Sequence, residues 1–189
     1  MILTNNLNVR GIEITPFNGD PKEQVSVDLT VGTLYQRSGD PDWLHVNEAL
    51  IIHPGTCLII QTAESIKMPN NAFGLLATKG SVGAKGVITA NTKLDPLFDG
   101  NLNIPVFNVG DRKIELRKGQ PYCSISFWTT ESPVIGNTTR NAIKAQPRTT
   151  SKLKDFLDRN AAHIITAVVS LTGAIGAALI TVYLRGPAL

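Results

Sequence analysis

Cysteine is scarce in this chain, which has only Cys57 and Cys123 among its 189 residues. Both lie in apolar, strand-like runs without the spacing of metal ligands, so we expect buried, reduced thiols, as suits a cytoplasmic domain. The histidines His45, His53 and His163 are scattered. Because no His/Cys cluster is present, the sequence excludes deaminases in which a bound zinc ion activates water.

Long helical periodicity is missing before about residue 150. Residues 1–135 are instead interrupted at short intervals by Gly, Pro, Asn and Asp, with apolar and β-branched runs between them. Several short strands at this spacing predict an all-β sandwich or barrel rather than a parallel sheet. The predicted strands are Val25–Val31, Leu58–Thr62, Phe73–Ala77, Asn103–Asn108, Lys113–Leu116 and Tyr122–Trp128.

Charged residues are absent from residues 161–184, AAHIITAVVSLTGAIGAALITVYL. A helix of this length at about 1.5 Å per residue spans a hydrocarbon layer of roughly 30 Å. A buried core helix is the alternative, but small domains rarely hold a helix that is apolar on every face. We therefore predict a C-terminal transmembrane helix, and a stripe of small residues such as Ser170 and Ala174 could let such helices associate.

Cations precede this span, with six Lys or Arg between Arg140 and Arg159 against Asp155 and Asp158. Such a run could bind nucleic acid. Beside a membrane span, however, the same cations would contact anionic lipid head groups, so we expect no nucleic acid partner. The positive-inside tendency then places the folded domain in the cytoplasm. Residues 151–160 carry Leu and Phe at helical spacing and predict an interfacial amphipathic helix, which makes 151–184 the lipid-binding region.

The predicted organisation is thus a β domain over residues 1–135, a linker over 136–150, the interfacial helix and the span. The linker is predicted because GNTTRNAIKAQPRTT is polar and lacks an apolar face.

Motif text is concentrated between His53 and Asn108, where HPG, TAES, KGSVGAKG and LDPLFDG follow one another, after SVDLTVG at Ser26–Gly32. In order and spacing these pieces resemble the dCTP deaminase and trimeric dUTPase superfamily, whose first strand reads S-x-D-x-R-x-G. The resemblance covers somewhat over half the chain. It implies a distorted jelly-roll or β-barrel, a homotrimer with sites between subunits, and a place in pyrimidine deoxynucleotide metabolism.

The segment Lys79–Gly86 falls where the family has R-S-S-x-A-R-x-G in deaminases and R-S-G-L-A in dUTPases. A glycine-rich turn with a hydroxyl group and a cation can hold phosphate, which makes Lys79 and Ser81 nucleotide-binding candidates. Lys79 replaces an arginine, and a point charge does not reproduce the bidentate guanidinium. The alternative is a glycine-rich surface loop with solvated lysines.

The segment Leu94–Gly100 matches I-D-P-G-W-S-G of the deaminases. The resemblance implies that this hairpin recognises the base and sugar, with Asp95 and Phe98 as nucleotide-binding candidates and the ring of Phe98 beneath the deoxyribose. A plain β-turn is the alternative, since Asp-Pro and Asp-Gly suffice for one.

The catalytic glutamate of the deaminases follows in a pattern like G-x-I-x-L-E-x-x-N, where it activates water. Counting from Gly100 to Asn108 without a gap places Pro105 at that position, and NLNIPVFN contains no carboxylate. Proline can act neither as acid nor as base, so family-type deamination is expected to be lost. Proline also removes a ladder donor, which predicts an edge or bulged strand.

The dUTPase branch needs no glutamate there, and its pattern makes Asp28 and Asp95 the catalytic candidates, with Mg²⁺ as cofactor if such activity survives. The glutamine expected near Ser124 and the glycine-rich C-terminal arm are missing. Because a lid contributes strongly to such hydrolysis, efficient dUTPase activity is not expected.

Two hypotheses follow. The favoured one is a membrane-anchored, trimeric, catalytically impaired member of the superfamily that serves as a structural, assembly or regulatory scaffold, in a virus for instance. The alternative is an enzyme of pyrimidine deoxynucleoside triphosphates, either a dCTP deaminase or a dUTP diphosphatase.

Overall fold

The structure is a computed structural model, and it describes residues 2–3, 7–17, 25–136, 139–147, 160, 163, 165–166, 169–177 and 180. The chain divides into two compact units, Met1–Arg148 and Thr149–Leu189. Within the described residues, no helix is long and apolar enough to cross a membrane. Residues 151–159 and much of 161–184 lie outside the described residues, so the interfacial helix and the span stay predictions.

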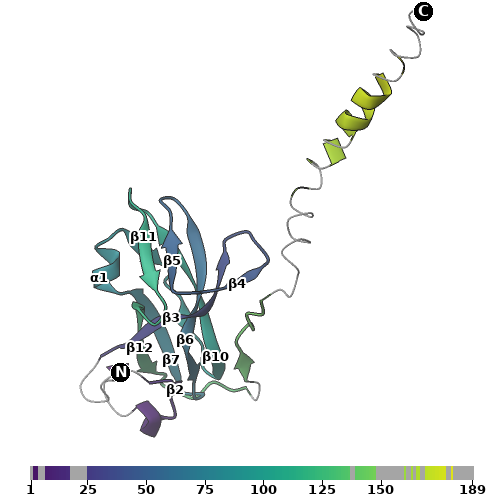
Figure 1. The fold of residues 1–189 in the computed structure, drawn as a ribbon. Helices are drawn as coiled ribbons and strands as arrows, with labels where there is room; N and C mark the ends of the chain where they lie inside the picture. Colours follow the sequence, from purple (N-terminus) through teal and green to yellow (C-terminus); the bar gives the residue numbers. More distant parts are fainter. Residues whose placement is uncertain are drawn as a thin grey trace, which may run out of the picture. The chain divides into compact units, whose positions relative to one another are not determined.

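The first unit is built from short strands (Figure 1). They are β1 (Ile2–Leu3), β2 (Glu13–Thr15), β3 (Val27–Arg37), β4 (Trp43–His45), β5 (Ala49–Ile52), β6 (Cys57–Lys67), β7 (Ala72–Thr78), β8 (Val87–Thr89), β9 (Lys93–Leu94), β10 (Phe98–Asn108), β11 (Ile114–Arg117), β12 (Pro121–Thr129) and β13 (Arg140–Asn141). A 3₁₀ turn, η1 (Leu7–Arg10), and a single helical turn, α1 (Gly80–Gly83), interrupt them.

The described strands form an 11-stranded sheet with the main order β13-β10-β6-β3-β12-β7-β9, and a second sheet of β11 and β5. The strand pairs are antiparallel, except that β13 runs parallel to β10. The backbones of β3 and β6 approach so closely that a Cβ on Gly32 would lie 2.6 Å from the carbonyl oxygen of Gln61. The glycine that ends the first family motif is therefore required by this contact.

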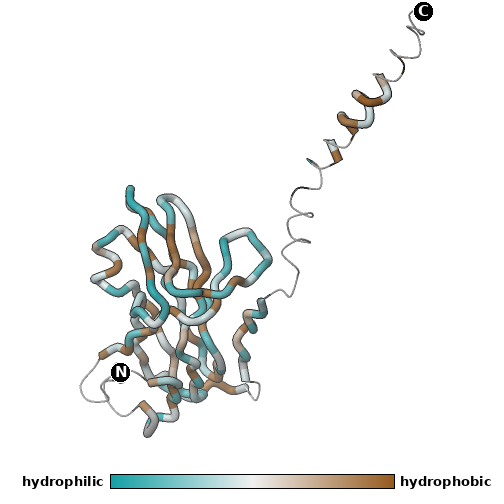
Figure 2. Tube along the Cα trace, viewed as in Figure 1, coloured by the Kyte–Doolittle hydropathy of each residue, from teal (hydrophilic) through white to brown (hydrophobic). Residues whose placement is uncertain are grey.

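The core lies between the inward faces of these strands, because buried residues alternate with more exposed ones along them. Hydrophobic and hydrophilic segments are interspersed along the strands (Figure 2). Along β6, for example, Leu58, Ile60 and Ile66 are buried while their neighbours are half-buried. Tyr122 and Phe127 are the largest fully buried side chains.

The predicted all-β class is confirmed, and each predicted strand overlaps one in the structure. The predicted linker 136–150 differs from the structure, in which the first unit extends to Arg148 and residues 140–141 form β13. The reason is that this polar stretch is held by backbone hydrogen bonds rather than by an apolar face.

Candidate functional site

One cluster of polar side chains forms around Asp28, where β3, β12 and β7 lie side by side. The hydroxyl group of Ser124 on β12 donates to Asp28 Oδ1 over 2.6 Å, and Asp28 Oδ2 is paired with the ammonium group of Lys79. Ser124 stands directly opposite Asp28 in the strand register, while Lys79 follows Thr78, which faces Cys123. These three side chains therefore meet because β3, β12 and β7 are neighbours in the sheet.

The charge state of Asp28 follows from these contacts. Partial burial raises the pKa of its carboxyl group, but the hydrogen bonds from Lys79 and Ser124 and the charge of Lys79 outweigh it, so the pKa lies below its ordinary value. A phosphate group would therefore have to compete with Asp28 for Lys79.

A magnesium ion does not fit this cluster. Both carboxylate oxygens of Asp28 already accept from Ser124 or Lys79. Among the described residues, no group of three or more His, Cys, Asp or Glu side chains could hold a metal ion. We derive no catalytic step from a metal at this site.

Ser81 lies in α1, where its side chain is exposed, and the turn is anchored by the buried Val82. The hydroxyl group of Thr78 accepts from the amide of Thr89 over 2.9 Å and lies 2.8 Å from the hydroxyl group of Thr89. Ser81 is therefore free to meet solvent, whereas Thr78 fastens β7 to β8.

A second group of candidate residues meets at the β9–β10 hairpin. Asp95 and Phe98 both line a hollow of about 310 Å³, which we call the hairpin hollow. The backbone turns at Leu97, whose φ is 66°, and the amide of Phe98 donates to the carbonyl group of Asp95 over 3.3 Å. The carboxylate of Asp95 pairs with Lys93 over 2.8 Å. Binding pockets begin at about 300 Å³, so the hollow can take a nucleoside but little more.

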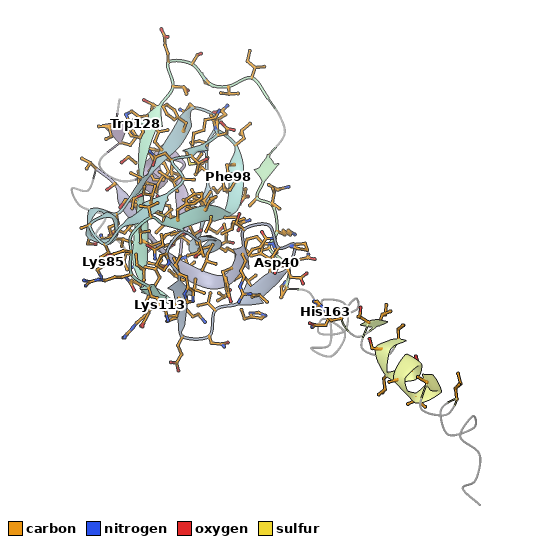
Figure 3. The ribbon with its side chains drawn as sticks, turned by 90° about the horizontal axis from the view of Figure 1, so that it is seen from above. Asp40, Lys85, Phe98, Lys113, Trp128 and His163 are labelled. Atoms are coloured by element: carbon orange, nitrogen blue, oxygen red, sulfur yellow. The ribbon has the colours of Figure 1, made fainter. Side chains whose placement is uncertain are left out.

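The remaining lining of the hairpin hollow comes from β9 and the residue before it, from β10, and from a segment near the edge of β10. The residues are Thr92, Lys93, Leu94, Asn101, Leu102, Asn103, Ile104, Asn141, Ala142 and Ile143. Figure 3 shows Phe98 on its strand beside β13. The contribution of residues 141–143 was not predicted, since a polar stretch carries no pattern that indicates where its backbone docks.

Within one chain, the candidates around Asp28 and Lys79 do not lie at the hairpin hollow. Asp28, Lys79 and Ser81 do not line the hairpin hollow. On β7, Lys79 follows the C-terminal end, whereas β9 pairs with Gly74 and Leu75 nearer the other end. The phosphate-type and base-type candidates therefore belong to different regions of one chain.

Pro105 lies on β10 opposite Ile59 of β6. Leu102, Ile104 and Val106 are buried, so Pro105 shares the other face of the strand with Asn101, Asn103 and Phe107. The carbonyl group of Pro105 accepts from the amide of Ala90 over 2.9 Å, and its nitrogen faces the same side, where β8 and β13 leave the strand unpaired. Pro105 stands in regular register opposite Ile59, so the strand is not bulged at the proline. The register with β6 shifts only between Asn101 and Asn103, where the extra residues lie on β6.

The glutamate closest in the sheet to this strand is Glu64 on β6, and it points into the core with 1% exposure. Its carboxylate accepts from the amide of Thr30 over 2.8 Å and from the hydroxyl group of Thr30 over 2.7 Å. Thr30 stands at the arginine position of S-x-D-x-R-x-G. A buried carboxylate fixed in this way cannot meet a substrate on the outer face.

Two further titratable groups lie near Glu64. Burial, with the charge of Glu64 adding to it, raises the pKa of Cys123 and that of Tyr122. Partial burial raises the pKa of the half-buried Cys57. All three thus stay neutral near pH 7, and both cysteines are free, as the sequence predicted for reduced thiols.

The comparison with known protein families agrees with this arrangement. A family described as dCTP deaminase-like matches residues 3–130. The chain belongs to the dCTP deaminase-like family. The resemblance seen in the motifs is therefore confirmed.

Among curated relatives, the dCTP deaminase of Thermococcus kodakarensis is 30% identical over 122 residues, which are 65% of this chain and 79% of that protein. The dCTP deaminase of Pyrococcus furiosus is also 30% identical over 122 residues, covering 65% of this chain and 78% of the relative.

Solved structures support the fold. The dCTP deaminase of Agrobacterium tumefaciens matches with a TM-score of 0.56 and 16% identity, covering 67% of this chain but only 47% of that chain. A mutant dUTPase from phage phi11 of S. aureus matches with a TM-score of 0.50 and 13% identity, covering 67% of this chain and 95% of that one. At such identities the likeness shows the fold alone.

Proposed function

We propose that this dCTP deaminase-like protein binds a pyrimidine deoxynucleotide at the hairpin hollow without deaminating it, and acts as a self-associating scaffold at a membrane. Pro105 carries the proposal, because it stands where the deaminase pattern has its water-activating glutamate. The outward residues beside it on β10 are two amides and a phenyl ring. None of these three side chains can take a proton from water.

Binding is supported by the chemistry of the hairpin hollow. Asp95 and Phe98 supply a carboxylate and an aromatic ring to the hollow. Asn101 and Asn103 add amide oxygens, since their Nδ2 atoms already donate to backbone carbonyl groups. A ring packed against the sugar disfavours a 2′-hydroxyl group. We therefore expect dCTP or dUTP to bind more tightly than CTP.

Self-association is supported by the separation of the two candidate groups. A second copy could bring Lys79 and Ser81 to the hairpin hollow of the first, which the fold of one chain does not do. An apolar surface is available for this purpose on β8 and β10, where Ile88 and Phe107 are register partners with 51% and 41% exposure. We propose a homotrimer, as the family resemblance implies.

Membrane attachment is proposed for residues 151–184. Charged residues lie in 151–160, and an apolar stretch without charged residues follows in 161–184. The full chain should float with liposomes in a density gradient, and the first unit alone should stay at the bottom. A full chain that stays with the first unit would contradict attachment and remove the positive-inside argument for a cytoplasmic β domain.

A nucleotide enzyme is the second candidate. It is favoured by the 30% identity to the dCTP deaminase of Thermococcus kodakarensis and by the carboxylate of Asp95 in the hairpin hollow. Incubation with dUTP, with and without Mg²⁺, followed by measurement of pyrophosphate, tests the hydrolase form. Pyrophosphate release that Asp95→Asn abolishes would replace the scaffold proposal.

The binding proposal is tested by titrating dCTP, dUTP and CTP into the full chain in a calorimeter. Asp95→Asn should weaken binding of the two deoxynucleotides at least about tenfold, as expected when a charged, half-buried hydrogen-bonding partner is lost. Asp111→Asn is the matched control, because Asp111 is exposed in the turn before β11. Absence of binding, or equal losses in both variants, would overturn the proposal.

A further inference from the structure

Residues 139–147, which we call the strap, run across the outer edge of β10. The strap begins as β13, which pairs Arg140 with Phe98 and Asn141 with Asp99 in parallel register. The amide of Ala142 then donates to the carbonyl group of Asp99 over 2.9 Å. The strap ends at a bridge between Pro147 and Trp43 on β4. It is thus attached at one end to β10, which lines the hairpin hollow, and at the other end to β4.

The middle of the strap lies directly against Gly100. This glycine has a φ of 136°, and a Cβ placed on it would lie 2.5 Å from Cβ of Ala142. No other residue would leave room for the strap at this point, since real Cβ atoms do not approach so closely. The glycine after the hairpin therefore serves the strap as well as the turn.

The strap lacks an apolar anchor. Among its side chains that the structure describes none is buried, Ala142 and Ala145 are half-buried, and Ile143 is 82% exposed. A few hydrogen bonds, each worth about 0.5–1.5 kcal/mol net, hold it in place. Segments with few buried apolar contacts open locally at low free-energy cost.

Asn103 shows that the closed strap leaves a buried polar atom without a partner. Its Nδ2 donates to the carbonyl oxygen of Ile143 in the strap over 2.9 Å. Its Oδ1 is buried and, among the described residues, has no hydrogen-bond partner. An unsatisfied buried acceptor costs free energy, so this atom favours a state in which the strap moves and the amide meets water or a ligand.

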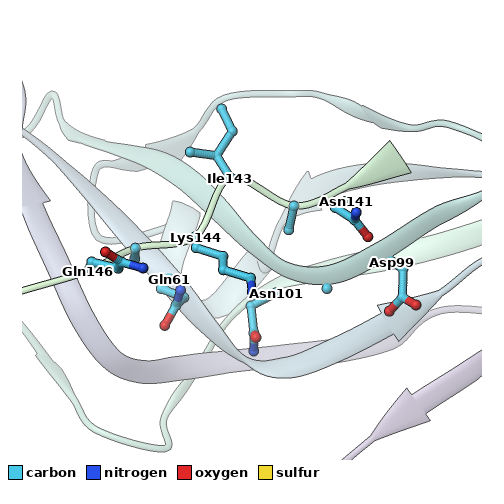
Figure 4. Close-up of a pocket in the computed structure, with 10 residues that line it drawn as sticks. Gln61, Asp99, Asn101, Asn141, Ile143, Lys144 and Gln146 are labelled. Carbon is cyan, nitrogen blue, oxygen red and sulfur yellow. The ribbon is translucent and has the colours of Figure 1, made fainter. Parts of the chain in front are cut away.

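Two hollows share the strap as a wall. The hairpin hollow lies on one side, and a second hollow of about 390 Å³, which we call the amide hollow, lies on the other. Asn101 and strap residues 141–143 line both. In the amide hollow, Lys144 runs toward Asn101, Gln61 and Gln146 lie near each other, and Ile143 points away (Figure 4). Without the strap, the two hollows would join as one trough along β10.

We propose that the strap is a displaceable partition, which admits a nucleoside moiety to the hairpin hollow but excludes a whole nucleoside triphosphate until it detaches from β10. The ligand class rests on the function proposed above, whereas the detachment of the strap does not. Since the chain continues from the strap into the second unit, any partner that pulls on that unit would favour the open trough.

Detachment is tested in the full chain with Ala142→Pro, which deletes the amide that donates to Asp99. A Trp128→Phe background leaves Trp43, beside the strap end, as the one tryptophan, since the chain has two. Acrylamide should quench Trp43 more strongly in Ala142→Pro than in Ala145→Pro, the same change at a strap position that, within the described part of the chain, takes no part in the pairing with β10. Equal quenching in the two variants would overturn the displaceable strap.

A second variant pair guards against a general folding defect. Gly100→Ala should displace the strap by steric contact, and Gly100→Ala/Ala142→Gly should restore it, because the contacting Cβ atom is then gone. Gly39→Ala is the control, since Gly39 also has a positive φ, of 84°, but nothing lies within 4 Å of an added Cβ. If the double variant quenches like Gly100→Ala, the strap contact at Gly100 is wrong.

The gating step is tested by titrating dCTP and dUTP into the same proteins. When the competent state is a minor one, its population limits the apparent affinity, so Ala142→Pro should bind at least about fivefold more tightly than wild type and Ala145→Pro should not. Equal or weaker binding by Ala142→Pro overturns the gate alone. Absence of binding by every protein overturns the proposed function, and Trp43 quenching still decides whether the strap detaches.

Discussion

At the residue scale, the pairing of Thr30 with Glu64 shows how neutral donors can hold a carboxylate in the core. In the family pattern, arginine precedes the glycine of the first motif by two positions, and this chain has a threonine there. The two donors of Thr30 now satisfy both oxygens of Glu64. A hydroxyl group can satisfy the buried carboxylate, and burying it costs less desolvation free energy than burying a cation would.

Replacing Thr30 by valine should lower the free energy of unfolding by about 2 kcal/mol, because a buried carboxylate oxygen loses its donor. Urea denaturation of the full chain measures the change. Thr33→Val, on the same strand at an exposed position, should cost far less. Similar losses in the two variants would mean that the hydroxyl group of Thr30 contributes little.

The pKa of Asp28 gives the Asp28–Lys79 pair a pH dependence. A carboxyl group whose pKa is lowered by folding contributes stability above its unfolded pKa of about 3.9 and loses it as pH falls through the folded value. Lys79→Met should therefore lower Tm at pH 7, and the gap to wild type should close below about pH 4. Lys85→Met, at an exposed position, should show no such gap. A gap that is constant with pH would contradict the pairing.

At the element scale, the long strands were predictable and the short ones were not. β6, β7 and β12 each contain an apolar or β-branched run of several residues, which is why the sequence predicts a strand there. β9 and β13 have two residues each, so they hold no period from which a strand could be inferred. For the same reason the sequence predicted Asp95 and Phe98 as a pair on one hairpin, but not the strap that forms a wall of their hollow.

The turn after β10 depends on Asn108, the asparagine that closes the catalytic-strand motif. Its Nδ2 donates to the carbonyl groups of Ile52 and Arg112 over 2.9 and 2.7 Å, and its Oδ1 accepts from the amide of Gly110 over 3.0 Å. The motif asparagine therefore fastens the end of β10 to β5 and to the following turn.

Asn108→Ala should lower the free energy of unfolding by about 2–3 kcal/mol, since buried backbone groups lose their partners. Differential scanning calorimetry against Asn71→Ala, an exposed turn position, isolates this effect. A loss no greater than that of the control would show that water replaces the asparagine.

At the scale of the whole molecule, self-association is what would join the two separated candidate groups. Phe107→Glu should turn an oligomer of about three chains into a monomer in light scattering, because a charge would be placed on the proposed interface. Leu75→Glu changes a residue of similar exposure, 43% against 41%, on β7 instead. If the oligomer survives Phe107→Glu but not Leu75→Glu, the interface lies on β7 and the proposed interface on β8 and β10 is wrong.

The central claim is that this chain binds dCTP but cannot deaminate it, since Pro105 lacks a proton-accepting group. The direct measurement is to incubate the full chain with dCTP carrying ¹⁵N at its exocyclic amine and to follow labelled ammonium by NMR, at a nucleotide concentration where calorimetry shows saturation. We expect bound dCTP and no labelled ammonium above the buffer control. Labelled ammonium that accumulates with wild type and is lost in Asp95→Asn would contradict it.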